Sequence, residues 1–187
     1  MPRIAFCTFV IFRERKGHEQ VQGFFDRTRD VMASAANSKG FVETLLAGSG
    51  DAPAIAGVES EVWPQFTPDY LDGEKQVSQA VTLSLWTDLE SVFAFAYRGV
   101  HGEAFRKRRD WILKPDYPTY VAWWVEDDHI PTREEAFQRL EHIHNRGSSP
   151  YAYNFKQPFD EQDQPVKLDR LIIEERIASN ETHQTED

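Results

Sequence analysis

At 187 residues, with 40% hydrophobic and 13% aromatic side chains, the chain is long enough to form one globular domain with a substantial core. Its formal net charge of −10 argues against a nucleic-acid partner, because binding to phosphates requires a basic surface. The charge is uneven, since residues 160–187 hold nine Asp or Glu against three Lys or Arg, so we expect a domain at 1–159 followed by an acidic extension.

The N-terminal segment favours a soluble, cytoplasmic protein with no membrane partner. Its apolar stretch at 4–12 (IAFCTFVIF) is too short to span a bilayer, and no small-residue cleavage site follows it. Cys7, the single cysteine, excludes an intrachain disulfide and a four-cysteine zinc site. A thiolate is also disfavoured inside an apolar strand, so we do not expect Cys7 to act as a nucleophile.

The spacing of apolar residues predicts alternating strands and helices. Residues 4–12 are β-branched and aromatic, as a buried strand requires, and a helix with apolar residues every three or four positions follows at 18–38. Asp88 and Thr132 are good N-caps for later helices. The remaining expected elements are strands at 41–47, 79–87 and 119–125, helices at 89–111 and 131–145, and a short closing strand at 151–157.

This β-α-β-β-α-β order is the split βαβ, ferredoxin-like pattern of the α+β class. It predicts a four-stranded antiparallel sheet with both long helices, 18–38 and 89–111, on one face. The other face needs a cover, and the usual cover is a second copy of the sheet. We therefore expect a homodimer.

Two further segments leave alternatives open. Residues 48–76 are rich in Gly and Pro but contain Trp63, so they form either a lid at the mouth of a pocket or a surface insertion. Residues 166–178 are apolar enough to dock on their own domain or on a partner. The polar end, 179–187, is expected to be disordered.

The helix at 89–111 carries the residues that bear most directly on chemistry. Phe93, Tyr97, His101, Phe105 and either Arg108 or Arg109 recur at three- or four-residue intervals and share a face. A histidine there can act as acid or base, a tyrosine can donate a proton, and an arginine can hold an enolate or carboxylate. The alternative is a buried His-Tyr pair that only orders the helix against the sheet.

Tryptophans add a second group of candidates. Trp123 and Trp124 alternate along one strand, so one must face the two long helices and the other the opposite face. They serve either core packing or stacking on a flat ligand. The expected substrate-binding set is Trp63, Trp86, Phe93, Phe105, Trp123 and Trp124.

Other patterns point away from specific chemistries. The basic run at 106–109 spreads around a helix and is expected to be a solvated helix end. The acids at 126–128 with His129 lack a second histidine at useful spacing, so we expect no metal. No HExxH, Walker, GxGxxG or GxSxG motif occurs.

The chain resembles a family of unknown function built on the dimeric α/β-barrel scaffold. The resemblance rests on LSLWTDLESVFAFAYRGVHGEAFRKRRDWI, the strand AWWV and HIPTREEAFQRLEHIHNRGSSPYAYNF, and covers about 4–159. It implies a homodimer of ferredoxin-like subunits. Relatives on this scaffold include cofactor-free monooxygenases of aromatic polyketides, polyketide cyclases and haem-dependent enzymes.

Three hypotheses follow. The leading one is a cofactor-free enzyme of secondary metabolism that binds an apolar aromatic or polycyclic substrate between sheet and helices. Cyclisation, rearrangement or oxygenation would use His101 as acid or base, with Tyr97 and Arg109 stabilising negative charge. The second is a protein that binds an apolar ligand or haem, with His101 as the iron ligand. The third is a non-catalytic dimer module whose aromatic residues are all core.

Overall fold

The computed structural model describes residues 1–49, 79–114 and 117–183 and confirms the predicted α+β class. Its antiparallel sheet has four strands in the order β2-β3-β1-β4, and both neighbours of β1 run antiparallel to it. Five helices lie within these ranges. The elements are β1 (Arg3–Ile11), α1 (Glu19–Ala36), β2 (Phe41–Ser49), β3 (Gln79–Trp86), α2 (Leu89–Tyr97), α3 (Gly99–Trp111), β4 (Tyr120–Val125), α4 (Arg133–Arg146) and α5 (Arg170–His183).

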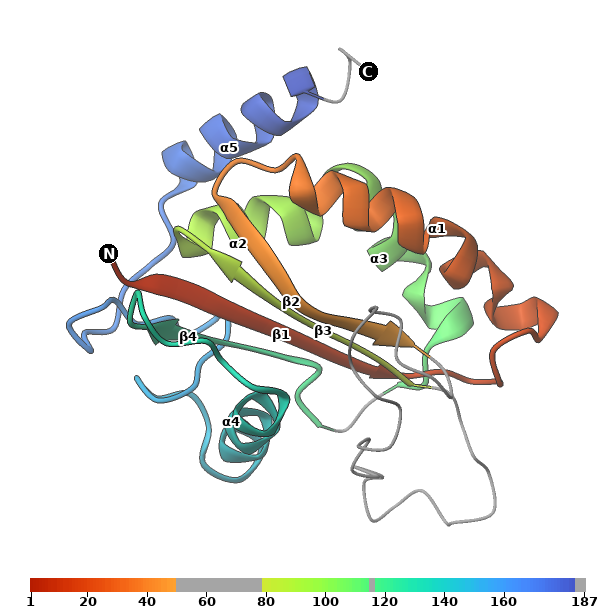
Figure 1. The fold of residues 1–187 in the computed structure, drawn as a ribbon, viewed down its shortest axis with the longest axis horizontal. Helices are drawn as coiled ribbons and strands as arrows, with labels where there is room; N and C mark the ends of the chain where they lie inside the picture. Colours follow the sequence, from red (N-terminus) through yellow and green to blue (C-terminus); the bar gives the residue numbers. More distant parts are fainter. Residues whose placement is uncertain (50–78, 115–116, 184–187) are drawn as a thin grey trace.

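The two faces of the sheet are covered by different helices. Helices α1, α2 and α3 cover one face, while α4 lies beneath the other (Figure 1). On the first face, Ile4 and Phe6 of β1 pack with Trp86 of β3. On the second, Phe137 of α4 meets Phe9 of β1 edge-on, with ring centroids 5.7 Å apart. The alternation of side chains along β1 therefore supplies two separate cores.

The chain covers its own second face, contrary to the sequence-based expectation. Trp123 of β4 is fully buried there, and the Arg139 guanidinium of α4 lies 4.8 Å from its ring centroid. Val81, Leu83 and Leu85 of β3 are buried on the same face. The expectation of an open face is wrong because the chain turns back after β4 and lays α4 across the sheet.

The predicted single helix at 89–111 is two helices. Arg98 separates α2 from α3 in an extended conformation, and Gly99 has a φ of +55°, which is left-handed backbone that favours glycine. Gly102 then approaches so closely that an added Cβ would lie 2.6 Å from the Tyr97 carbonyl oxygen. Helical periodicity continues across the break, which is why the sequence pattern concealed it.

The predicted closing strand at 151–157 is also wrong. Tyr153 and Ala122 exchange two backbone hydrogen bonds at 2.9 and 3.0 Å, but only isolated bridges form around them. The backbone turns locally instead: the Gln157 N–H donates to the Asn154 carbonyl at 3.2 Å, and the Lys156 N–H donates to the Asn154 side chain at 2.9 Å. In these turns the backbone N–H and carbonyl groups bond within the segment, whereas in a strand they would bond to a neighbouring strand.

Predicted helix caps are confirmed. The Ser91 N–H donates to Asp88 Oδ1 at 2.7 Å at the start of α2. The Glu135 N–H donates to Thr132 Oγ1 at 3.2 Å at the start of α4. Each bond satisfies a backbone donor that has no partner within its helix.

The C-terminal helix docks on its own domain. Arg176 Nε of α5 donates to Ser91 Oγ of α2 at 3.0 Å, and the same guanidinium lies 3.5 Å from the Asp88 carboxylate. Asn180 Oδ1 accepts from the Lys39 N–H at 2.8 Å. The disorder expected from residue 179 onward is wrong as far as His183, since α5 runs to that residue.

Candidate functional site

A cavity of about 830 Å³ lies between the sheet and helices α1 and α3. This volume falls within the range of small-molecule sites, which is about 300–1,000 Å³. Its sheet side is formed by residues of one parity on β1, such as Phe6 and Thr8, and their neighbours on β3. Its apolar walls include Phe6, Val10, Phe24, Val31, Met32, Phe41, Trp86, Phe95, Phe105, Trp111 and Phe155.

His101 lines this cavity near the start of α3. Its Nδ1 lies 2.7 Å from the Ala96 carbonyl oxygen, and a carbonyl can only accept, so Nδ1 carries the proton. The imidazole also packs against Phe95, with ring centroids 4.7 Å apart. Within residues 1–49, 79–114 and 117–183 no hydrogen bond reaches Nε2. In the neutral tautomer, Nε2 therefore keeps a lone pair that can take a proton.

Burial lowers the pKa of His101 below the ordinary histidine value, because the charged imidazolium loses its hydration. The hydrogen bond to the Ala96 carbonyl acts in the opposite direction and is the weaker effect. His101 is therefore neutral near pH 7. That is the protonation state a general base requires.

Two tyrosines meet on the wall next to this histidine. Tyr97 on α2 and Tyr120 on β4 both line the cavity. Burial raises the pKa of Tyr120, and the neighbouring Tyr97 raises it further. Phe155 packs against both rings, with centroids 5.8 Å from Tyr97 and 5.0 Å from Tyr120. The Tyr120 phenol therefore holds a proton that it can donate to an oxyanion.

Hydroxyl groups lie along the sheet side of the cavity. Thr8 and Thr82 face each other across β1 and β3, and their Oγ1 atoms are 2.7 Å apart. Ser84, one pair farther along β3, accepts a hydrogen bond from Trp86 Nε1 at 2.8 Å. A polar strip therefore crosses an otherwise apolar surface. Such sparse polar groups orient a ligand.

Positive charge gathers at the end of the cavity near the C-terminus of α3. The charged residues there are Arg13, Arg27, Arg108, Arg109 and Lys114, and no Asp or Glu is found among the described residues that line the cavity. Arg27 and Arg108 are half-buried, while the other three are exposed.

The structure brings together some of the predicted site residues and separates others. Phe93 lies behind Tyr97, with ring centroids 4.7 Å apart, and does not line the cavity. Trp124 packs in the core of the same face and donates from Nε1 to the Phe159 carbonyl at 2.9 Å. Trp123 lies on the opposite face, and Trp63 lies outside the described residues. His101, Tyr97, Arg109, Trp86 and Phe105 all line the cavity.

Sequence reasoning missed several cavity residues. Tyr120 could have been found, since it shares the strand alternation of Trp124 and so faces the helices. The pairing of Thr8 with Thr82 depends on strand register, and the position of Arg27 depends on how α1 packs against α3. Neither can be read from local periodicity.

Other potential chemistries receive no support from the described side chains. No group of three His, Cys, Asp or Glu residues that could hold a metal occurs in residues 1–49, 79–114 and 117–183. Burial raises the pKa of the Cys7 thiol to about 12, and Cys7 belongs to the core beneath α4 rather than to the cavity. In the same ranges, no helix combines the length and apolarity needed to cross a membrane.

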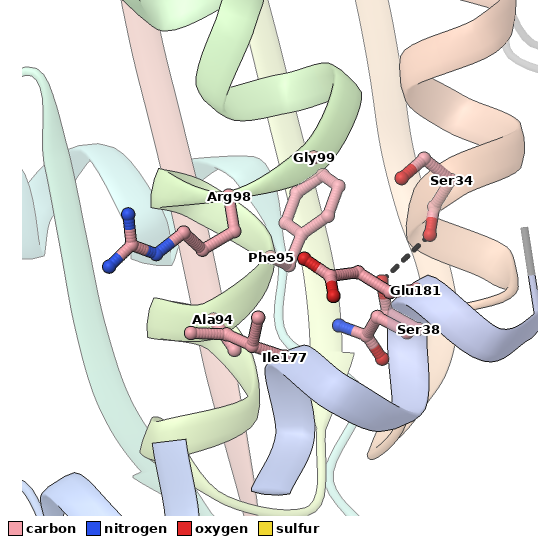
Figure 2. A pocket seen from close by; sticks show the side chains of 9 residues that line it. Ser34, Ser38, Ala94, Phe95, Arg98, Gly99, Ile177 and Glu181 are labelled. Carbon is pink, nitrogen blue, oxygen red and sulfur yellow. Dashed lines mark hydrogen bonds between the residues drawn. The ribbon is translucent and has the colours of Figure 1, made fainter. Parts of the chain in front are cut away.

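A second hollow lies between α5, α1 and the junction of α2 with α3 (Figure 2). Ile177 and Glu181 of α5 line it together with Phe95 of α2, Ser34 of α1 and Ser38, which follows α1. Its volume is about 20 Å³, which is room for about one water molecule. The larger cavity is therefore the candidate site.

Comparison with known proteins assigns the chain to a family. A family model described as domain of unknown function (DUF3291) matches residues 3–169. The chain belongs to this family. Membership of DUF3291 confirms the resemblance to a family of unknown function, and the matched range includes the whole sheet and α1–α4 but ends just before α5. No curated protein matches the chain.

Proposed function

We propose that this protein is an enzyme that performs acid/base chemistry on an apolar aromatic or polycyclic small molecule without a cofactor. The observation that carries the proposal is His101, a half-buried imidazole on the wall of a largely apolar cavity, with its pKa lowered by loss of hydration. Its Nδ1–H is fixed by the Ala96 carbonyl, so its orientation and tautomer are set before substrate binds. A preorganised neutral imidazole is well suited to proton abstraction.

The proposed step is proton transfer from an acidic C–H or O–H of the substrate to His101 Nε2. The electron pair stays on the substrate as an enolate or phenolate, and the Tyr97 and Tyr120 hydroxyls donate hydrogen bonds to it. Arg109 at the cavity end adds positive charge. In a cyclisation or rearrangement, the carbanion carbon forms a bond to an electrophilic carbon of the same substrate, and the electron pair displaced there takes the proton back from His101. In an oxygenation, O₂ is the oxidant: the carbanion carbon forms a C–O bond to it, the resulting peroxide takes the proton from His101, and loss of water leaves a carbonyl group.

A second candidate is an apolar-ligand or haem-binding protein. A histidine that donates from Nδ1 to a carbonyl and leaves Nε2 without a partner in the described chain is also the arrangement found in metal-ligating histidines. His101 would hold the iron, which would supply redox chemistry when bound. A Soret band in purified protein that disappears in His101→Gln would favour this candidate over the cofactor-free enzyme.

We also propose that the protein acts as a homodimer, as its resemblance to the dimeric α/β-barrel scaffold implies. The α4 helix already covers Trp123, so a partner would have to meet this sheet face around α4 or use another surface. Light scattering at micromolar concentration should give twice the chain mass of 21.7 kDa. A mass of one chain would contradict the dimer without affecting the cavity.

Turnover by variants tests the catalytic proposal. The assay would follow a panel of phenolic and β-dicarbonyl aromatic compounds by mass spectrometry, with wild-type protein and His101→Gln. Loss of a general base should lower the rate by about 10²–10⁴-fold while ligand binding is retained. His142→Gln is the matched control, since His142 lies on α4 and bonds to Ser149 at 2.9 Å, away from the cavity. Full turnover by folded His101→Gln would end the catalytic role of this residue.

A further inference from the structure

The positive charge of the cavity stands out against the composition of the chain. The whole sequence has 31 acidic and 21 basic residues, yet the described cavity lining has four arginines, one lysine and no acid. Charged residues drawn at random from this composition would include acids as well as bases. The cavity is thus electrostatically opposite to the protein as a whole, and such a site concentrates anions.

The three arginines with described contacts donate to backbone carbonyls. Arg13 Nε donates to the Arg109 carbonyl at 3.0 Å, Arg27 donates to the Gly23 carbonyl at 2.7 Å, and Arg108 donates to the Phe105 carbonyl at 2.8 Å. Across the described ranges, none of the cavity cations forms an ion pair with a carboxylate. Each guanidinium has five N–H donors, so these bonds leave further donors for a ligand.

Two of these arginines are held against aromatic rings inside the wall. The Arg108 guanidinium carbon lies 3.8 Å from the Phe105 ring centroid, and that of Arg27 lies 5.5 Å from the Trp111 ring centroid. Both side chains are half-buried. Stacking fixes the planar groups and removes part of their hydration, which strengthens their attraction for an anion.

From these observations we infer that the ligand is an organic anion, an apolar aromatic body that carries a carboxylate or phosphate group. The inference rests on the proposed function of the same cavity. The anionic group binds to Arg27 and Arg108 at the C-terminal end of α3, with Arg13, Arg109 and Lys114 around it. The aromatic body lies toward Trp86 and Phe95.

The helix sets the distance between this anchor and the base. Arg108 stacks on Phe105, which follows His101 by four residues, or about 6 Å of helix axis. A ligand bound through its anion therefore presents to His101 an atom roughly one helical turn away. This spacing would select substrates by their length, and the positive charge would select those that are anions.

Two fluorescent probes test the inference, because they share one aromatic body. 8-Anilinonaphthalene-1-sulfonate is the anionic probe, and N-phenyl-1-naphthylamine is the same arylamine without the sulfonate. Arg27→Gln and Arg108→Gln should each weaken the anionic probe by about tenfold, while the neutral probe changes by less than about twofold. Arg106→Gln, an exposed arginine of α3 that does not line the cavity, is the control for net charge. Equal effects of all three variants on the anionic probe would overturn the inference.

Wild-type protein provides a test that does not depend on variants folding. Affinity for the anionic probe should fall about tenfold or more between about 0.05 and 0.5 M NaCl, because salt screens partly exposed charges, and the neutral probe should not weaken. Displacement by 2-naphthoate, 2-naphthyl phosphate and neutral 2-acetylnaphthalene then tells carboxylate from phosphate. If 2-acetylnaphthalene displaces the probe as well as both anions do, the inference is wrong.

The same titrations separate this inference from the proposed function. If the neutral probe binds but the affinity of the anionic probe depends neither on salt nor on the arginines, only the inference of an anionic ligand is contradicted. Failure of both probes to bind would instead contradict the proposed ligand cavity.

Discussion

The proposed chemistry of the cavity depends on one imidazole whose two nitrogens have different surroundings. His101 Nδ1 donates to the Ala96 carbonyl at 2.7 Å, and this bond exists only because the chain breaks between α2 and α3 and returns the ring toward α2. Phe95 packs on the ring and Tyr97 lies in the same wall. Tautomer, orientation and protonation state are thus determined by neighbouring residues of the chain.

Nuclear magnetic resonance of ¹⁵N-histidine-labelled protein should show His101 as the Nδ1–H tautomer with a pKa below 6.5. Burial favours the neutral form, so the folded protein takes up this proton only at lower pH than the unfolded chain does. Stability from this residue is complete above pH 6.5 and is lost as pH falls through the lowered pKa. Turnover that needs the neutral base should fall over the same acidic range.

His101→Gln identifies the signal in that experiment. It should also remove the decrease in the free energy of unfolding that protonation of His101 causes below about pH 6.5. A His101 signal that titrates above 6.5, or that shows a proton on Nε2, would contradict the environment described for the ring.

At the scale of elements, the break between α2 and α3 is the feature on which the site depends. The segment 89–111 has continuous helical periodicity, but Gly99 adopts a positive φ and Gly102 packs against the Tyr97 carbonyl. The break changes the direction of the chain between Tyr97 and His101. Both residues still line one cavity, although they belong to different helices.

Gly102→Ala should destabilise the protein by about 1–3 kcal/mol, because the new Cβ would lie 2.6 Å from the Tyr97 carbonyl oxygen and the backbone must shift. Thermal unfolding measures the loss. Glu103→Ala, at the next and exposed position of the same helix, is the control and should change stability little. An unchanged melting temperature for Gly102→Ala would show that α3 does not approach α2 as closely as described.

The sequence patterns predicted most of the helices and strands but not how they are arranged in space. The apolar alternation of β1, the caps at Asp88 and Thr132 and the positions of the four strands along the chain were all predictable, because each depends on local propensity and periodicity. The extended backbone at Arg98 was not, because it results from packing of α3 against α2. The turns that replace the strand predicted at 151–157 were also not predicted, although the Asn154 side chain, which accepts from the Lys156 N–H, is a local turn signal.

The candidate site shows the same division. The spacing of Tyr97, His101 and Phe105 placed all three on one cavity wall, even though the helix between them is interrupted. Trp123 was expected near a ligand or a partner, but α4 buries it on the opposite face. Which face of a sheet receives a later helix is a property of chain topology, and residue spacing within one strand contains no information about it.

At the scale of the whole molecule, the sheet separates two regions with different roles. The face beneath α4 is a packed core in which Trp123, Phe9 and Cys7 are fully or nearly fully buried. The face beneath α1 and α3 encloses the cavity of about 830 Å³, with His101, two tyrosines and the arginines at its edge. The candidate site and the core beneath α4 therefore lie on opposite faces of one sheet.

We propose that this cavity is a binding site in which a ligand contacts His101. A crystal structure of the protein soaked with 2-naphthoate is the sharpest test of this claim. We expect the naphthalene ring between the sheet and α3, in contact with His101 and Tyr97, and its carboxylate next to Arg108. A well-ordered protein in which side chains fill this space, or in which the ligand binds only elsewhere, would contradict the claim.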